Sequence, residues 1–88
     1  MRFPGSAEEL IYKCRMRNDE NGATEPLPKT AEWFSTHKTL PRIGDTVIPL
    51  EFGPVNKPFF IVQSVMWDIN KNEVIILLEK ELARNLNI

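Results

Sequence analysis

Two strongly apolar segments in the second half of the chain constrain the fold most. They are Phe59–Asp68, FFIVQSVMWD, and Glu73–Lys80, EVIILLEK, and the polar run Asp68–Asn72 joins them. Such a short connection between two β-favouring runs predicts a hairpin. Both runs carry apolar residues on both faces in their central parts. That pattern is typical of strands that are enclosed by a barrel or covered by another layer.

Length, net charge and cysteine content exclude several classes of protein. A chain of 88 residues, 42% of them hydrophobic, predicts a single small domain over residues 1–88 with one core. A net charge of −1 argues against a general binder of polyanions. One cysteine excludes an internal disulfide, and one cysteine with one histidine cannot form a structural zinc site.

The sequence also predicts no membrane segment. Its longest apolar run, Val74–Leu78, is far too short for a membrane-spanning helix, and Met1–Gly5 contains no signal-peptide core. We therefore expect a cytoplasmic protein with no membrane partner and no cofactor.

The first predicted strand is Glu8–Arg17. One face carries Leu10, Tyr12, Cys14 and Met16, and the other face carries Ile11, Lys13, Arg15 and Arg17. This alternation is the period of a half-buried strand. Residues 18–29 are predicted to form an exposed loop, because they contain turn-forming residues around Gly22 and two prolines.

The segment Thr30–Lys38, TAEWFSTHK, fits two structures. We favour a strand because threonine, tryptophan and phenylalanine suit strands and the segment lies between a strand-like run and a turn. A short helix capped by Thr30 is the alternative. After the turn Leu40–Asp45, a strand is expected over Thr46–Phe52, at an edge or bulged because Pro49 has no N–H to donate.

These elements predict a mainly β fold. We expect a five-stranded antiparallel sheet that forms an SH3-like barrel or a strongly bent sheet. The residues Leu78, Leu82 and Leu86 have helical spacing, which predicts a short C-terminal helical turn within Glu79–Leu86.

The second half of the chain resembles a known group of proteins. The run Leu40–Val47, LPRIGDTV, followed by Phe60–Val62 and Val65–Trp67, is similar to small SH3-like barrel proteins of bacterial and phage genomes. The resemblance implies the fold and not the function, and our hypothesis is that the protein is encoded by a phage or another mobile element. The resemblance implies no catalytic or ligand-binding residue, because the matching positions are structural.

No catalytic set is expected. Cys14 lies on the apolar face of its strand, where a thiol packs as a small hydrophobe, and His37 lies in a polar run. The carboxylates occur as local surface pairs, and the four glycines are isolated rather than gathered in a phosphate-binding loop. We therefore expect no enzyme activity, no catalytic residue and no metal ligand.

The most specific polar feature is a row of cations on one face of the first strand. Lys13, Arg15 and Arg17 recur at every second residue and span about 13 Å. The predicted partner-binding residues are Lys13, Arg15, Arg17, Trp33, Phe34 and Arg42.

Several interpretations of this row remain open. We expect a non-enzymatic binding or regulatory module with a protein partner, because arginine and aromatic residues dominate protein interfaces. The alternative is a small barrel that binds single-stranded nucleic acid. The other interpretations are a solvated strand face, and an unpaired edge strand that pairs with another chain in a homo-oligomer or a strand-addition complex.

Overall fold

The hairpin predicted in the second half of the chain is part of the sheet. In the computed structural model, which describes residues 9–17, 22–52 and 58–80, β4 (Phe60–Asp68) pairs antiparallel with β5 (Glu73–Lys80). The turn is held by Asp68, whose Oδ1 accepts a hydrogen bond from the Lys71 amide at 3.3 Å. Asn72 adopts a positive φ of 56°, which asparagine tolerates better than most residues. The hairpin prediction is confirmed.

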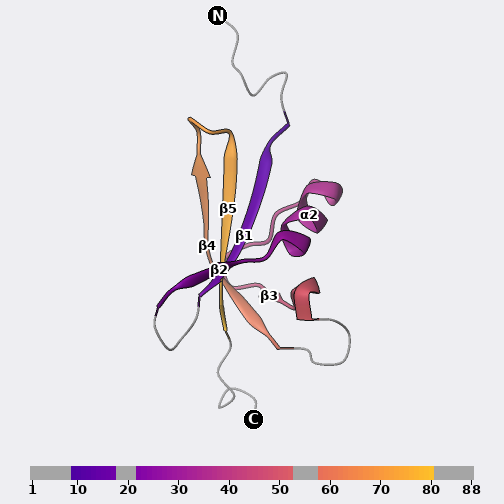
Figure 1. Cartoon of the computed structure of the whole chain (residues 1–88), viewed down its shortest axis with the longest axis vertical. Helices are drawn as coiled ribbons and strands as arrows, with labels where there is room; N and C mark the ends of the chain where they lie inside the picture. The colour runs from indigo at the N-terminus through magenta and orange to yellow at the C-terminus, as the bar shows by residue number, and fades with distance from the viewer. Residues whose placement is uncertain (1–8, 18–21, 53–57, 81–88) are drawn as a thin grey trace, which may run out of the picture.

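Five strands form one mixed sheet that curls into a half-barrel (Figure 1). Their order is β2-β1-β5-β4-β3, where β1 is Ile11–Arg17, β2 is Thr24–Pro26 and β3 is Thr46–Val47. The prediction of a mainly β fold with five strands is confirmed.

The prediction of a purely antiparallel sheet is wrong. β1 runs parallel to β5, with Ile11 opposite Glu73 and Arg17 opposite Glu79. Parallel neighbours need a long connection, and the chain between these strands supplies one that contains a helix and three further strands. The sequence pattern indicates that the segments of β1, β3, β4 and β5 are strands, but it carries no information about their direction in the sheet.

The prediction of a strand over Thr30–Lys38 is also wrong, because Pro28–His37 forms the helix α2. Proline suits the first turn of a helix, where its missing N–H has no partner to lose. One face of α2 is buried through Thr30, Ala31 and Phe34. Burial at spacings of one, three and four residues fits a helix rather than the alternation of a strand.

Several other elements begin or end at residues that differ from the predicted ones. The loop expected over residues 18–29 contains β2 and the buried Leu27, and the first strand begins at Ile11 rather than Glu8. The strand expected over Thr46–Phe52 ends at Val47, and a 3-10 turn, η1 (Leu50–Phe52), follows. β3 is nevertheless an edge strand, as predicted. Of the predicted C-terminal helical turn, residues 79 and 80 belong to β5, and residues 81–88 lie outside the described residues.

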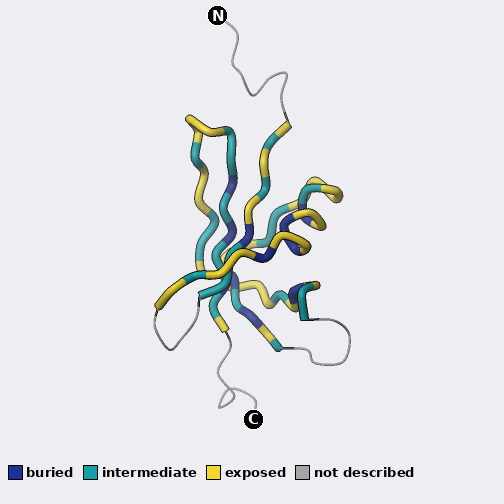
Figure 2. The backbone as a smooth tube through the Cα atoms, in the orientation of Figure 1, coloured by how far each residue is buried: buried dark blue, intermediate teal, exposed yellow. Residues whose placement is uncertain are grey.

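The core lies between α2 and the sheet. Figure 2 shows that the buried segments of the sheet and of α2 lie together near the middle of the molecule. The buried cluster contains Cys14, Leu27, Ala31, Phe34, Phe60, Val62, Ile76 and Leu78. Tyr12 and Met16 pack against this cluster, whereas Ile11 and Lys13 are exposed. The two faces predicted for the first strand are therefore confirmed.

No helix in the described part of the chain combines the length and the apolar character that crossing a membrane requires.

Candidate partner-binding groove

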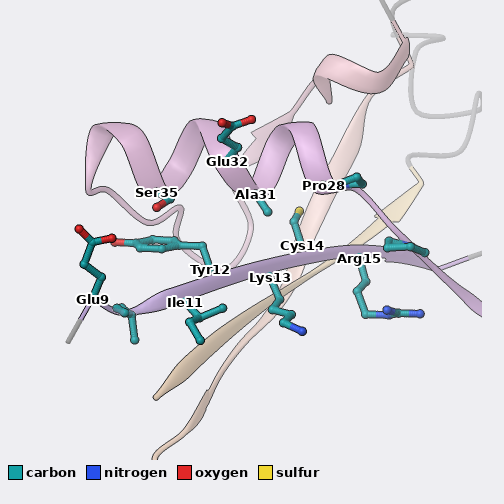
Figure 3. Close-up of a pocket in the computed structure, with 12 residues that line it drawn as sticks. Glu9, Ile11, Tyr12, Lys13, Cys14, Arg15, Pro28, Ala31, Glu32 and Ser35 are labelled. Atoms are coloured by element: carbon teal, nitrogen blue, oxygen red, sulfur yellow. The ribbon is translucent and has the colours of Figure 1, made fainter. Parts of the chain in front are cut away.

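The predicted cations lie on the face of β1 that points away from α2, as Figure 3 shows for Lys13 and Arg15. Lys13 is exposed, and its Nζ lies 3.7 Å from Oε2 of Glu73 on the neighbouring strand. Arg15 is half-buried and donates from Nε and Nη2 to the hydroxyl and carbonyl oxygens of Thr24. Arg15 therefore fastens β2 to β1.

Arg17 is also half-buried, and its Nε has no hydrogen-bond partner among the described residues. Of the three cations in the row, Lys13 is the one with an exposed side chain. Two residues of this row therefore contact neighbouring strands: Arg15 contacts Thr24 of β2, and Lys13 contacts Glu73 of β5.

The remaining predicted residues lie elsewhere. Trp33 is 44% exposed on α2, where its ring stacks on His37 at 4.1 Å between centroids. Phe34 is 6% exposed and packs in the core, so it does not form part of an exposed binding face. Arg42 is exposed in a turn, where its N–H donates to Oδ2 of Asp45 at 2.8 Å. The six predicted residues do not form one site.

The structure contains instead an open groove of about 560 Å³ along the edge of β1, beside α2 (Figure 3). Its lining residues come from the start of β1, from the end of β2 and from one face of α2. They are Glu9, Leu10, Ile11, Tyr12, Lys13, Cys14, Arg15, Pro26, Pro28, Ala31, Glu32 and Ser35.

The groove exists because β2 is short. β2 pairs only with Arg15–Arg17, and the last contact on this edge is the hydrogen bond from the Leu27 N–H to the Cys14 carbonyl at 2.7 Å. At Pro28 the chain leaves the sheet and enters α2. Among the described residues, no strand pairs with the β2 side of β1 before Cys14.

The backbone of Tyr12 points into this groove. The Ile11 N–H donates to the Asn72 carbonyl at 2.9 Å, so Ile11 presents its backbone groups toward β5. Cys14 presents its carbonyl to Leu27 on the opposite side. Because successive residues of a strand direct their backbone groups to alternate sides, the N–H and C=O of Tyr12 also point away from β5.

The two rims of the groove differ in charge. Figure 3 shows Glu9 and Glu32 on the side of α2, whereas Lys13 and Arg15 lie on the other side of β1. A segment bound along β1 therefore meets the carboxylate of Glu9 on one face and the cations on the other.

Cys14 lies on the groove wall without the properties of a nucleophile. Its side chain is buried, and this burial, together with the negative charge of Glu51, raises the pKa of the thiol to about 12. The thiol is therefore protonated at neutral pH. Nδ1 of His37 is hydrogen-bonded to the carbonyl of Trp33 at 2.8 Å rather than to the thiol.

Glu51 holds the helix that forms one wall. Its carboxylate accepts hydrogen bonds from the backbone N–H groups of Lys29 and Thr30 and, at 2.6 Å, from the Thr30 hydroxyl. Partial burial acts to raise the pKa of Glu51, but the hydrogen bonds from Thr30 and Lys29 outweigh it and lower the pKa below 4.5. The ionised carboxylate thus satisfies the first N–H groups of α2.

Sequence reasoning missed the wall of the groove that α2 supplies. Its residues Ala31, Glu32 and Ser35 were placed on a strand, where they cannot share a wall with Tyr12. The sequence contained two signs of a helix. Pro28 suits its first turn, and Thr30, Ala31 and Phe34 recur at helical spacing. In the described part of the chain, no group of three or more His, Cys, Asp or Glu side chains is arranged to hold a metal ion.

Comparisons with protein-family models, with curated proteins and with solved structures each give no match to this chain. The resemblance to small SH3-like barrels therefore stays a prediction.

Proposed function

We propose that this protein is a non-enzymatic module that binds another protein through the groove between β1 and α2. The observation that carries the proposal is the open edge of β1, where Tyr12 directs its backbone groups into a groove of about 560 Å³. An exposed strand edge beside a helix is a recurring site for the capture of polypeptide segments. The groove also offers apolar and charged side chains that can select among segments.

A protein partner fits this surface better than single-stranded nucleic acid. Nucleic-acid grooves combine several free cations with aromatic side chains on which bases stack. Here Arg15 is bonded to Thr24, and Lys13 lies beside Glu73. Trp33 belongs to α2, which covers the opposite face of the sheet from the cations.

The test is a selection of binding peptides on the immobilised protein, followed by affinity measurements with two matched variants. Ser35→Arg places a bulky cation in the groove, and Thr36→Arg places the same side chain on an exposed position of α2 outside the groove. We expect the selected peptides to lose at least tenfold in affinity for Ser35→Arg and to keep their affinity for Thr36→Arg.

Failure of the selection to yield any peptide would contradict the proposal, as would peptides that bind both variants equally. A titration with oligothymidylate at two salt concentrations tests the nucleic-acid alternative. Salt-sensitive binding that disappears when Lys13, Arg15 and Arg17 are all replaced by alanine would favour that alternative.

A further inference from the structure

We propose that the partner binds as an extended segment that adds a short antiparallel strand to the free edge of β1. Its side chains would alternate between acidic residues on the face of Lys13 and apolar or basic residues on the face of α2. This inference rests on the proposed function, because it specifies how the groove is occupied and by which chemistry.

The backbone groups of Tyr12 are the first feature that supports the addition of a strand. The N–H and C=O of Tyr12 point toward the groove, so a residue opposite Tyr12 can exchange both backbone hydrogen bonds with it. β2 already pairs with this edge of β1 in the antiparallel sense and ends at Pro26. A strand beside Ile11–Lys13 would occupy the next part of the same edge, in the space that the chain leaves free when it enters α2.

The face toward α2 selects for small apolar and basic side chains. A side chain opposite Tyr12 lies on the same face as Tyr12 and meets Ala31 and Ser35 across the groove. Ala31 and the protonated Cys14 offer no charge, which favours a β-branched apolar side chain at the centre. The Glu9 carboxylate lies on this face beside Tyr12, and Glu32 also lines the groove, although in Figure 3 its carboxylate points away from β1. These negative charges favour basic side chains at the ends of the bound segment.

The opposite face selects for acidic side chains. A residue opposite Lys13 lies directly beside a lysine side chain that is 53% exposed and whose ammonium group lies 3.7 Å from the carboxylate of Glu73. That contact is long and exposed, so the ammonium group keeps donors free for a second carboxylate. Opposite charges paired across two strands stabilise their association, whereas like charges oppose it.

The charge pattern of the two rims permits a test with two peptides of the same composition. With its valine opposite Tyr12, acetyl-Lys-Glu-Val-Glu-Lys-amide directs its lysines and valine toward α2 and its glutamates to the other face, one opposite Lys13 and one opposite Ile11. Acetyl-Glu-Lys-Val-Lys-Glu-amide reverses every charge and keeps the same β-strand propensity. Each is titrated to millimolar concentration into the isotopically labelled protein at low salt, and the amide signals are followed by NMR.

We expect the first peptide to shift the Tyr12 amide signal, to slow its hydrogen exchange, and to bind at least fivefold more tightly than the second. Methylation of the valine nitrogen should abolish binding, because it removes the N–H that donates to the Tyr12 carbonyl. Lys13→Glu should reverse the preference between the peptides. The matched variant Lys71→Glu, which makes the same change in the turn between β4 and β5, should leave it unchanged.

Four results would overturn strand addition. The first is binding of either peptide without a change at the Tyr12 amide, and the second is equal binding of both peptides. The third is no binding of either peptide at millimolar concentration, and the fourth is dimerisation of the protein through this edge in sedimentation experiments. If library-selected peptides still lose affinity for Ser35→Arg in any of these cases, the groove binds proteins in another mode and the proposed function stands.

Discussion

The carboxylate of Glu51 replaces the side-chain cap that α2 lacks at its own N-terminus. Leu27 occupies the cap position and offers no hydrogen-bonding side chain. Glu51, which lies more than twenty residues away in sequence, accepts hydrogen bonds from Lys29 and Thr30 instead. The Thr30 hydroxyl in turn accepts a hydrogen bond from the Leu50 N–H at 3.0 Å, so helix and turn hold each other. The sequence could not show this pairing, because neither residue is near the other in the chain.

Glu51→Gln is expected to lower the free energy of unfolding by about 1–2 kcal/mol at neutral pH, because the ionised acceptor of the first helical N–H groups is lost. The pKa of Glu51 is lowered in the folded state, so its contribution is present above the unfolded value of 4.5 and is lost as the pH falls through the folded value. Urea unfolding of wild type and variant should therefore give a difference that shrinks below pH 4.5.

Glu25→Gln, an exposed carboxylate on β2, is the matched control and should differ little from wild type at either pH. A constant deficit for Glu51→Gln at every pH would show that the charge of Glu51 is not what stabilises the helix.

Among the elements, α2 departs most from what its sequence favours. Its threonine, tryptophan and phenylalanine residues favoured a strand, yet the segment is a helix in which Trp33 is 44% exposed and Phe34 is buried. The helix ends where Lys38 adopts the left-handed conformation, with φ 50° and ψ 48°. The N–H groups of Lys38 and Thr39 then donate to the carbonyls of Ser35 and Phe34, which closes the last turn. Glycine is the usual residue at this position, so lysine gave no signal of a helix end.

Lys38→Gly is expected to raise the free energy of unfolding by about 0.5–1 kcal/mol, because glycine adopts a positive φ without the steric cost of a Cβ atom. The same replacement inside the helix, Glu32→Gly, should instead lower stability by about 0.5–1 kcal/mol. Urea unfolding of both variants measures the two effects. A loss of stability for Lys38→Gly would mean that the lysine side chain itself stabilises the helix end.

At the scale of the whole molecule, the central position of β5 explains the most apolar segment of the sequence. β5 lies between β1 and β4, so both of its backbone edges are paired. Val74, Ile76 and Leu78 are fully buried toward α2, whereas Ile75 and Leu77 are half-buried on the other face. The continuous apolar run predicted a strand that is enclosed by a barrel or covered by another layer, whereas the structure fully covers only one of its faces.

Two adjacent isoleucines allow the faces of β5 to be compared with the same substitution. Ile76→Ala should lower the free energy of unfolding by about 3–4 kcal/mol, because it leaves a cavity in the core. Ile75→Ala should cost about 1 kcal/mol, since its side chain is only half-buried. Chemical denaturation of both variants measures the difference. Equal losses would show that the outer face of the sheet is packed as tightly as the core.

The sequence by itself determined β1, β3, β4 and β5, the hairpin, the two faces of β1 and the edge position of β3, but not β2, which lies in a segment predicted to be a loop. Each of these follows from residues that are neighbours in the chain, through alternation of apolar side chains, turn chemistry or the missing N–H of proline. Only the tertiary structure decided the direction of β1, the helical state of Pro28–His37 and the groove between them. Those features depend on contacts between distant residues, such as Ile11 with Asn72 and Thr30 with Glu51, and a local pattern cannot encode them.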